Sequence, residues 1–328
     1  MTAHPWVAGA GVRTRFAVQL WNARGFDGDG QPVRHETPVR TLLEAARVAE
    51  AAGLDGVFVD DHPLVSLIDP WPLLSAVAAT TGRVWLGSMV NCVSYRHPAQ
   101  LARLTADLDE LSGGRLVLGL GIGWAEDDFR ALDVAMGTMG ERHRALEEAL
   151  AIIDGAWGSE PFSFSGRTFR TEGMRLFPDG VRRPRPPVLI AGRGERVTLR
   201  QVARFADACN VLESAAGGVD DLRHKFSVLE RHCEEVGRPY DEVLRTHRGR
   251  YTLLAPTEAE ARAKLASHVA DDTPPRWRAA VTAMTPEQAV EHFRERAGAG
   301  VQYFVVMVDA ADHETVHLLA NDVAPHVA

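Results

Sequence analysis

The side chains best suited to acid–base chemistry in this sequence follow a short apolar run. The run that begins at Gly56 ends in Asp60, Asp61 and His62. Imidazole titrates near neutral pH, and a neighbouring carboxylate can orient it or favour its charged form. We therefore interpret His62 as a candidate proton donor or acceptor, with Asp61 beside it. A histidine that only makes hydrogen bonds at a strand end is the alternative.

A second motif is rich in glycine. Gly119, Gly121 and Gly123 stand at every second position, so on a strand they would share one face without side chains. We expect that a planar ring could lie against this bare backbone. The spacing fits the dinucleotide signature poorly, because that signature has two residues before its last glycine. A Rossmann fold is therefore disfavoured.

A third motif, Gly192-Arg193-Gly194, precedes a helical pattern that begins at Glu195. Backbone amides and the positive end of the helix dipole could hold a phosphate there, and Arg193 would add a charged fork. An ordinary strand-to-helix turn that needs glycine for its dihedral angles is the alternative.

Eight apolar runs bounded by turn residues would position these motifs. Most are continuous Val, Leu and Ile runs, typical of sheets buried on both faces. Helical patterns separate nearly all of them, which favours an α/β fold, a (β/α)8 TIM barrel with inserted loop and hairpin segments. An open doubly wound sheet is the competing topology. The predicted strands are Phe16 to Leu20, Gly56 to Asp60, Val84 to Asn91, Leu116 to Gly121, Pro187 to Ala191, Ala208 to Leu212, Arg245 to Leu254 and Val301 to Val308.

The helical pattern is clearest over Pro38 to Ala52. Glu44 and Arg47 face outward, and Gly53 ends the helix; its apolar stripe is Leu42, Leu43, Ala46, Ala49 and Ala52. In a barrel the C-terminal ends of the strands form one rim, so we expect the three motifs to meet there in a single domain, residues 1–328. The other predicted helices are Trp71 to Thr80, Pro98 to Leu111, Glu141 to Trp157, Glu195 to Phe205, Asp220 to Val236, Pro286 to Ala297 and His313 to His326.

Two segments interrupt the alternation. Phe162 to Phe177 predicts an inserted β hairpin that turns at Ser165-Gly166-Arg167, and Arg182 to Pro187 leads back to the barrel. Ala270 to Thr285 contains Asp271-Asp-Thr-Pro-Pro and predicts a loop near the barrel mouth. Both insertions could act as lids.

Composition narrows the function classes. The 328 residues carry a net charge of −8, which argues against nucleic-acid binding. Three cysteines without framework spacing indicate a reducing compartment, and we expect the cytoplasm. The N-terminus shows no signal pattern and no apolar run is long enough to span a bilayer, so we expect no membrane. His62, His97 and His143 lack the spacing of zinc ligands, so we expect no metal site.

Six motifs recur in order along the chain: Gly53-Leu-Asp-Gly-Val-Phe-Val-Asp-Asp-His62, Tyr95-Arg-His-Pro98, Ser112-Gly-Gly-Arg115, Leu118-Gly-Leu-Gly-Ile-Gly-Trp124, Ile190-Ala-Gly-Arg-Gly194 and Ala206-Asp-Ala-Cys-Asn210. Taken together, they resemble the luciferase-like monooxygenase superfamily, in particular its branch that uses the deazaflavin coenzyme F420. The resemblance implies a (β/α)8 barrel that binds F420 or, alternatively, reduced FMN, and a homodimer.

The resemblance implies roles for individual residues. His62 would transfer a proton, and Asp61 would face the cofactor ring with it. The end of the third strand would back the ring through a non-prolyl cis peptide, and the glycine turns would hold the ring edge and the phosphate. The implied cofactor-binding residues are Asp61, Met89, Val90, Asn91, Gly123, Gly192, Arg193 and Gly194.

The chain also departs from part of the family. Pro63, Leu64 and Val65 stand where the sugar-phosphate dehydrogenases carry a tryptophan, and Trp124 stands where they carry a glutamate. We therefore do not expect a sugar phosphate as substrate. The expected activity is hydride transfer between F420 and a small, apolar organic substrate. The alternatives are an FMN-dependent monooxygenase that uses oxygen and a flavin-binding protein without turnover.

Overall fold

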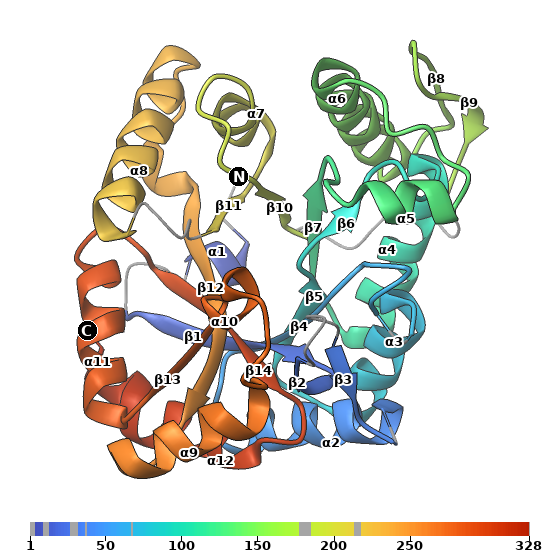
Figure 1. Ribbon diagram of the computed structural model, residues 1–328. Helices are drawn as coiled ribbons and strands as arrows, with labels where there is room; N and C mark the ends of the chain where they lie inside the picture. Colours follow the sequence, from blue (N-terminus) through green and yellow to red (C-terminus); the bar gives the residue numbers. More distant parts are fainter. Residues whose placement is uncertain are drawn as a thin grey trace. The chain divides into compact units, whose positions relative to one another are not determined.

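The computed structural model describes residues 4–8, 13–26, 32–36, 38–66, 68–176, 185–212 and 218–327. Over these residues the main sheet has ten strands in the order β10-β11-β12-β14-β1-β4-β5-β7-β6, with β13 beside β12 (Figure 1). An additional β10–β7 pairing closes the sheet, which gives the predicted α/β barrel. The strands are β1 (Arg15–Trp21), β4 (Gly56–Val59), β5 (Trp85–Ser88), β6 (Asn91–Cys92), β7 (Leu116–Gly121), β10 (Val188–Ala191), β11 (Ala208–Leu212), β12 (Leu244–Leu254), β13 (Val281–Met284) and β14 (Tyr303–Asp309).

The chain divides into two compact units, each built from three stretches of sequence. Unit 1 contains Met1–Ala8, Asp60–Cys209 and Leu229–Val243, and unit 2 contains Gly9–Val59, Asn210–Val228 and Leu244–Ala328. Every candidate site residue belongs to unit 1. That residues 1–328 form a single domain stays a prediction.

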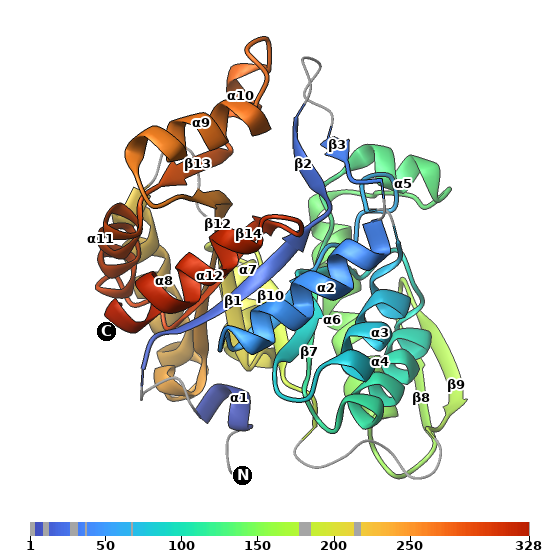
Figure 2. The same ribbon diagram turned by 90° about the horizontal axis from the view of Figure 1, so that it is seen from below.

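In unit 1, the buried strand β7 is flanked by helices whose ends are encoded locally. Helix α4 packs beside α3 and α6 (Figure 2). Asp69 caps α3 through the amide of Trp71, and Thr138 forms a capping box with Glu141 at the start of α6. Gly113 ends α4 in a left-handed conformation. The helices of unit 1 are α1 (Pro5–Ala8), α3 (Pro70–Thr80), α4 (Pro98–Ser112), α5 (Glu126–Ala131), α6 (Met139–Ala156) and α7 (Thr198–Phe205).

Unit 2 packs aromatic and aliphatic side chains between its strands and helices. Phe16 stacks on Phe304, and both meet Phe293 of α11 edge to face. The helices assigned wholly to this unit are α2 (Pro38–Ala51), α9 (Glu258–His268), α10 (Pro275–Arg278), α11 (Pro286–Ala297) and α12 (His313–Leu318), whereas α8 (Gly218–Glu235) contributes to both units.

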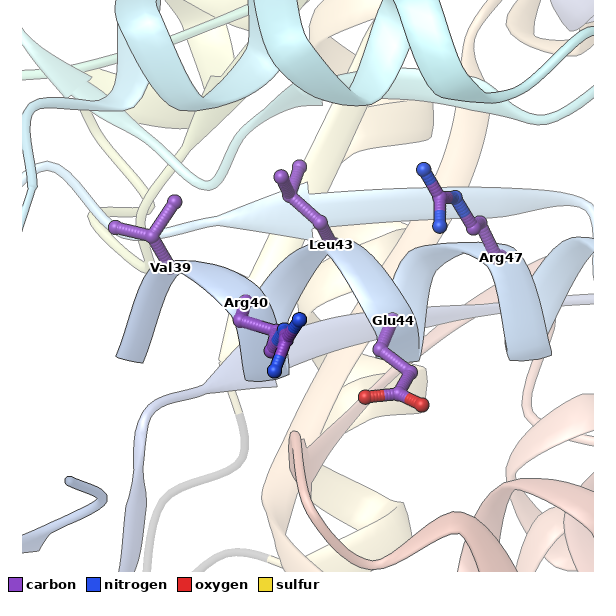
Figure 3. A pocket seen from close by; sticks show the side chains of 5 residues that line it. All are labelled: Val39, Arg40, Leu43, Glu44 and Arg47. Carbon is purple, nitrogen blue, oxygen red and sulfur yellow. The ribbon is translucent and has the colours of Figure 1, made fainter. Parts of the chain in front are cut away.

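The predicted helix over 38–52 is confirmed as α2, which Gly53 follows with a positive φ. Glu44 and Arg47 are exposed as predicted, whereas Leu43 is only half-buried and lies between Val39 and Arg47 on the outer surface (Figure 3). The buried residues of the helix are Leu42, Ala45, Ala46 and Ala49, and all of them except Ala45 belong to the predicted stripe.

The predicted hairpin is confirmed as β8 (Phe162–Ser165) and β9 (Arg170–Met174), which pair antiparallel beside α6 (Figure 1). Glu148 of α6 holds the turn of this hairpin. Its carboxylate accepts hydrogen bonds from the backbone amides of Arg167, Thr168 and Phe169 at 2.8 to 3.0 Å. Residues 177–184, which include the ends of two predicted segments, lie outside the described part of the chain.

The predicted loop over 270–285 is wrong, because it contains α10 and the parallel strand β13, which pairs with β12. Its apolar run is only four residues long, so sequence periodicity gave little signal. Three further features were not predicted from the sequence: α5, α9 and the hairpin of β2 (Ala23–Phe26) and β3 (Pro32–Arg34). The last predicted helix changes after Leu318 into a π-helical turn, Leu319–Val323, and a 3-10 turn, Ala324–His326. Among the described helices, none has the length and apolarity needed to cross a membrane.

Candidate active site

The centre of the candidate site is a hydrogen-bonded pair, His62 and Asp128. The Nδ1 atom of His62 lies 2.7 Å from Oδ2 of Asp128. The imidazole side chain is 25% exposed, whereas the carboxylate is 2% exposed. The other carboxylate oxygen accepts the amide of Leu64 at 3.1 Å. The pair therefore places a fixed, buried carboxylate behind a ring that solvent or a substrate can reach.

Asp128 reaches His62 because α5 starts directly after the turn that follows β7. It is the third residue of that helix, and the hydroxyl of Tyr95 lies 3.5 Å from its Oδ2. Burial raises the pKa of Tyr95, and the nearby charge of Asp128 adds to that effect, so Tyr95 stays a neutral donor. Asp128 was not predicted from the sequence. The sequence did carry a signal for it: three acidic residues, Glu126, Asp127 and Asp128, follow the glycine motif and are typical of the first turn of a helix.

The expectation that Asp61 orients His62 is wrong, because Asp61 has a different partner. Its two carboxylate oxygens accept hydrogen bonds from Arg96 at 2.8 and 3.0 Å, and the amide of Cys92 donates at 3.3 Å. Burial raises the pKa of Asp61, and the hydrogen bonds from Arg96 work against that effect. Asp61 thus holds β6 and the segment that follows it. Its direct contact with a cofactor stays a prediction.

The predicted third strand is interrupted where the resemblance placed a cis peptide. Met89–Val90 is cis, and the strand splits there into β5 and β6. The expectation of a bare glycine face on β7 is wrong. A Cβ atom on Gly119 would lie 2.2 Å from the carbonyl oxygen of Ser88, and one on Gly121 would lie 2.8 Å from Val90. These glycines therefore make room for the interrupted strand beside them.

Asn91 follows this interruption and leaves a buried acceptor open. Its Nδ2 donates to the carbonyl of Gly119 at 3.0 Å, whereas its Oδ1 is buried and has no hydrogen bond in the described structure. The hydroxyl of Ser88 is in the same state. Buried polar atoms without partners are uncommon, so two of them around Met89 and Val90 mark a position where a ligand could supply the missing bonds.

Gly123 lies in a crowded turn after β7. Its φ is +75°, and a Cβ atom would meet Cys92 and Phe129 at 2.6 and 2.8 Å, so only glycine fits there. The guanidinium of Arg142 donates to the Gly123 carbonyl. Arg142 is buried despite its charge, with 9% of its surface exposed. It therefore helps to fix the turn.

The turn over Gly192 to Gly194 is also tightly packed. Cβ atoms on these two glycines would lie 2.9 and 2.7 Å from the side chain of Thr198, the first residue of α7. The helix begins there and not at Glu195, because residues 195–197 form a separate turn. Binding of a phosphate by this turn stays a prediction, as does the contribution of Arg193.

Strand pairing brings the turns of unit 1 to one edge. Leu120 of β7 pairs with Asn91 on one side and with Ile190 on the other, all in parallel register. Chain segments that follow parallel strands leave the sheet on the same side. The turns after β6, β7 and β10 are therefore neighbours. His62 contacts this group of turns through its hydrogen bond with Asp128, which lies in the helix after the β7 turn.

Other reactive groups in this region are inactive or structural. Burial raises the pKa of Cys92 to about 11, so its thiol is protonated at neutral pH. The Nδ1 atom of His143 donates a hydrogen bond to Oε1 of Gln201 at 2.8 Å, which joins α6 to α7. Within the described ranges, no group of three or more His, Cys, Asp or Glu side chains is placed to hold a metal ion.

The hollow shown in Figure 3 is not part of this site. It lies on the surface of α2 in unit 2, and none of its lining residues is a candidate site residue. The residues are Val39, Arg40, Leu43, Glu44 and Arg47.

Comparison with known proteins agrees with this fold. Residues 20–310 match the sequence profile of the luciferase-like monooxygenases. The chain belongs to the luciferase-like monooxygenase family. The coenzyme F420 dependent tetrahydromethanopterin reductase of Methanopyrus kandleri has the same fold, with a TM-score of 0.77 over 97% of this chain and 100% of that chain, at 16% identity.

Two curated members of the family are similar to this chain in sequence. The F420-dependent hydroxymycolic acid dehydrogenase of Mycobacterium tuberculosis is 36% identical over 196 residues, which cover 57% of this chain and 53% of that protein. The F420-dependent glucose-6-phosphate dehydrogenase of Nakamurella multipartita is 31% identical over 217 residues, which cover 62% of this chain and 60% of that protein. The matches thus span little more than half the length of these relatives.

Proposed function

We propose that this member of the luciferase-like monooxygenase family is an F420-dependent oxidoreductase. It transfers a hydride between the deazaflavin and a small organic substrate. The observation that carries the proposal is the 2.7 Å contact between His62 and Asp128 at the edge where the turns of unit 1 meet. The two curated relatives above, which are both named as F420-dependent dehydrogenases, support the same cofactor.

The residues of unit 1 suit a deazaflavin. Its ring carries an N–H group, and the open Oδ1 acceptor of Asn91 could take that hydrogen bond. Met89 and Val90 would lie beside the ring. Gly123 would contact its edge, and the turn of Gly192, Arg193 and Gly194 would hold the phosphate. Asp61 would act indirectly, by holding Arg96 and the amide of Cys92.

The F420 deazaflavin supplies the hydride acceptor or donor, and the protein positions it. The role of His62 follows from its hydrogen bond. Asp128 is an acceptor when ionised, so Nδ1 of His62 carries the hydrogen, and Nε2 of the neutral ring has a free lone pair. Nε2 can take the proton of a substrate hydroxyl, and Asp128 stabilises the resulting imidazolium. In the reverse direction the same ring returns the proton.

Binding decides between F420 and FMN. We expect titration with F420 to quench the cofactor fluorescence with a dissociation constant in the micromolar range or below. Under the same conditions FMN should bind at least tenfold more weakly. Asn91→Ala should weaken F420 binding by about tenfold, whereas Asp127→Asn on the exposed side of α5 should leave it unchanged. Saturable FMN binding with oxygen uptake would favour the monooxygenase instead, and no binding of either cofactor would refute both.

We also propose the assembly and location that the resemblance implies. The protein would be a homodimer that works on a small molecule in the cytoplasm, without nucleic acid or membrane. All three cysteines, Cys92, Cys209 and Cys233, are buried and none is joined in a disulfide, which suits a reducing compartment. Light scattering after size-exclusion chromatography tests the dimer, and a monomer at micromolar concentration would contradict it.

A further inference from the structure

Two large apolar side chains lie exposed next to the His62–Asp128 pair. The Trp124 ring meets the His62 ring edge to face, with centroids 5.4 Å apart, and Trp124 is 73% exposed. Leu64 is 51% exposed, and its amide donates to Asp128. A tryptophan of this size is rarely left so open to water. We call Leu64 and Trp124 the apolar rim of His62.

The charges around the apolar rim are acidic. Glu126 and Asp127 begin α5 two and three residues after Trp124, and both are exposed. The nearby arginines are engaged with protein groups. Arg130 pairs with Asp127, so these two charges offset each other, whereas Arg96 is shared by two carboxylates, Asp61 and Asp69, and Glu126 adds a further negative charge. The part of unit 1 beside His62 thus offers apolar surface and negative charge, which suit a neutral ligand and repel an anion.

We infer that the apolar rim selects the substrate: a neutral alcohol, or the ketone formed from it, whose non-reacting part is a hydrocarbon that covers Trp124 and Leu64. This inference rests on the proposed function. Leu64 and Trp124 act as specificity residues, because each buried methylene of the substrate contributes binding through the hydrophobic effect. The same rim disfavours a substrate that carries a carboxylate or phosphate.

The reaction at this site balances without another reactant. The C–H bond at the carbinol carbon breaks, and its electron pair leaves as hydride to oxidised F420, which is thereby reduced. The hydroxyl O–H bond breaks, and its proton moves to Nε2 of His62. The carbon–oxygen single bond becomes a carbonyl. The alcohol is oxidised to a ketone, and the proton later leaves His62 for solvent.

Tryptophan fluorescence of the full chain tests the contact without turnover. We expect 2-octanol to shift the emission of Trp124 to shorter wavelength in a saturable way, measured as the difference between wild type and Trp124→Phe. Half-saturation with 2-octanol should come at a concentration at least tenfold lower than with 2-butanol, since four methylenes are added. The anion 3-hydroxybutyrate, which also has a secondary hydroxyl, should give no shift at the same concentrations.

Matched variants separate the apolar rim from general effects. Leu64→Ala should weaken 2-octanol binding by about threefold to tenfold, whereas Leu111→Ala, a leucine that is 70% exposed on α4, should not. No Trp124-dependent shift with 2-octanol, or a shift at equal or lower concentrations of 3-hydroxybutyrate, would overturn the inference.

Turnover distinguishes this inference from the proposed function. With bound F420, kcat/KM for 2-octanol should exceed that for 2-butanol by at least tenfold. Trp124→Ala should reduce this ratio below about threefold, and Trp124→Phe should restore most of it. If F420 binds and is reduced but the ratio does not depend on Trp124, or glucose 6-phosphate is preferred, only the inference fails. If F420 does not bind at all, the proposed function fails.

Discussion

Two aspartates of unit 1, Asp61 and Asp128, are similarly buried but pair with different kinds of side chain. They are 4% and 2% exposed. Asp61 accepts two hydrogen bonds from Arg96, a cation that keeps its charge at all physiological pH values. Asp128 faces His62, whose imidazole can both donate and accept a proton. The first pair is not suited to proton exchange, whereas the second can take part in it.

The difference shows that the partner decides what a buried carboxylate does. It also shows that the neighbour in sequence need not be the partner in space. Asp61 precedes His62 directly, yet the carboxylate that contacts His62 comes from 66 positions further along the chain. Successive side chains of an extended segment point to opposite sides, so adjacent residues at a strand end seldom pair.

Removing the imidazole should have the largest effect on this comparison. We expect His62→Ala to lower kcat by about 10²-fold to 10⁴-fold, because the substrate loses its proton acceptor. Stability and F420 binding should change little, since His62 is partly exposed. His97→Ala, which removes an exposed histidine from the cap of α4, is the control. Full activity in His62→Ala would assign proton transfer to another group.

Removing the charge of Asp61 should cost stability and not chemistry. We expect Asp61→Asn to lower the free energy of unfolding by about 3 kcal/mol, because Arg96 keeps its charge beside a neutral amide in a buried place. Asp69→Asn should cost under about 1 kcal/mol, since Asp69 is the exposed partner of the same arginine. Denaturant unfolding measures both. Loss of F420 binding at unchanged stability would instead show that Asp61 contacts the cofactor.

Removing the charge of Asp128 should reverse that pattern. We expect Asp128→Asn to lower kcat by about 10²-fold. The imidazolium form of His62 would lose the negative charge beside it, and the neutral ring would lose the carboxylate that fixes its tautomer. KM and stability should change less. Asp127→Asn, one residue earlier and exposed, should be silent. Equal effects of the two variants would mean that α5 acts through its net charge alone.

A third buried carboxylate, Glu148, adds the case of a partner without charge. Three backbone amides of the hairpin turn donate hydrogen bonds to its carboxylate. Burial by itself would raise the pKa of Glu148, but these hydrogen bonds outweigh burial, so the pKa lies below its usual value. A lowered pKa means that the ionised carboxylate stabilises the fold above its usual pKa, and that this contribution is lost as pH falls through the lowered value.

We therefore expect Glu148→Gln to lower the free energy of unfolding by about 1–2 kcal/mol at pH 7. The difference from wild type should shrink in acid, below the lowered pKa of Glu148. Glu160→Gln, at an exposed position, is the control. A difference that is the same at pH 7 and in acid would show that the charge of Glu148 does not matter.

Much of the site was visible in the sequence as motifs, but their contacts were not. His62 and the glycine turns were found because strand ends and glycine spacing are local patterns. The cis peptide at Met89–Val90 came only from resemblance. Arg142 was missed because its charge is typical of an exposed helix face, and only packing shows that it reaches the Gly123 carbonyl.

The sequence by itself determined the alternation of strands and helices, the hairpin after Phe162 and the edge at which the motifs gather. These follow from periodicities of 2 and 3.6 residues and from turn chemistry, which act over a few neighbours. The tertiary structure alone decided that Asp128 pairs with His62, that Arg96 takes Asp61, and that Ser88 and Val90 cover the glycines of β7. Such contacts join residues tens of positions apart, and only the packed fold sets which side chains meet.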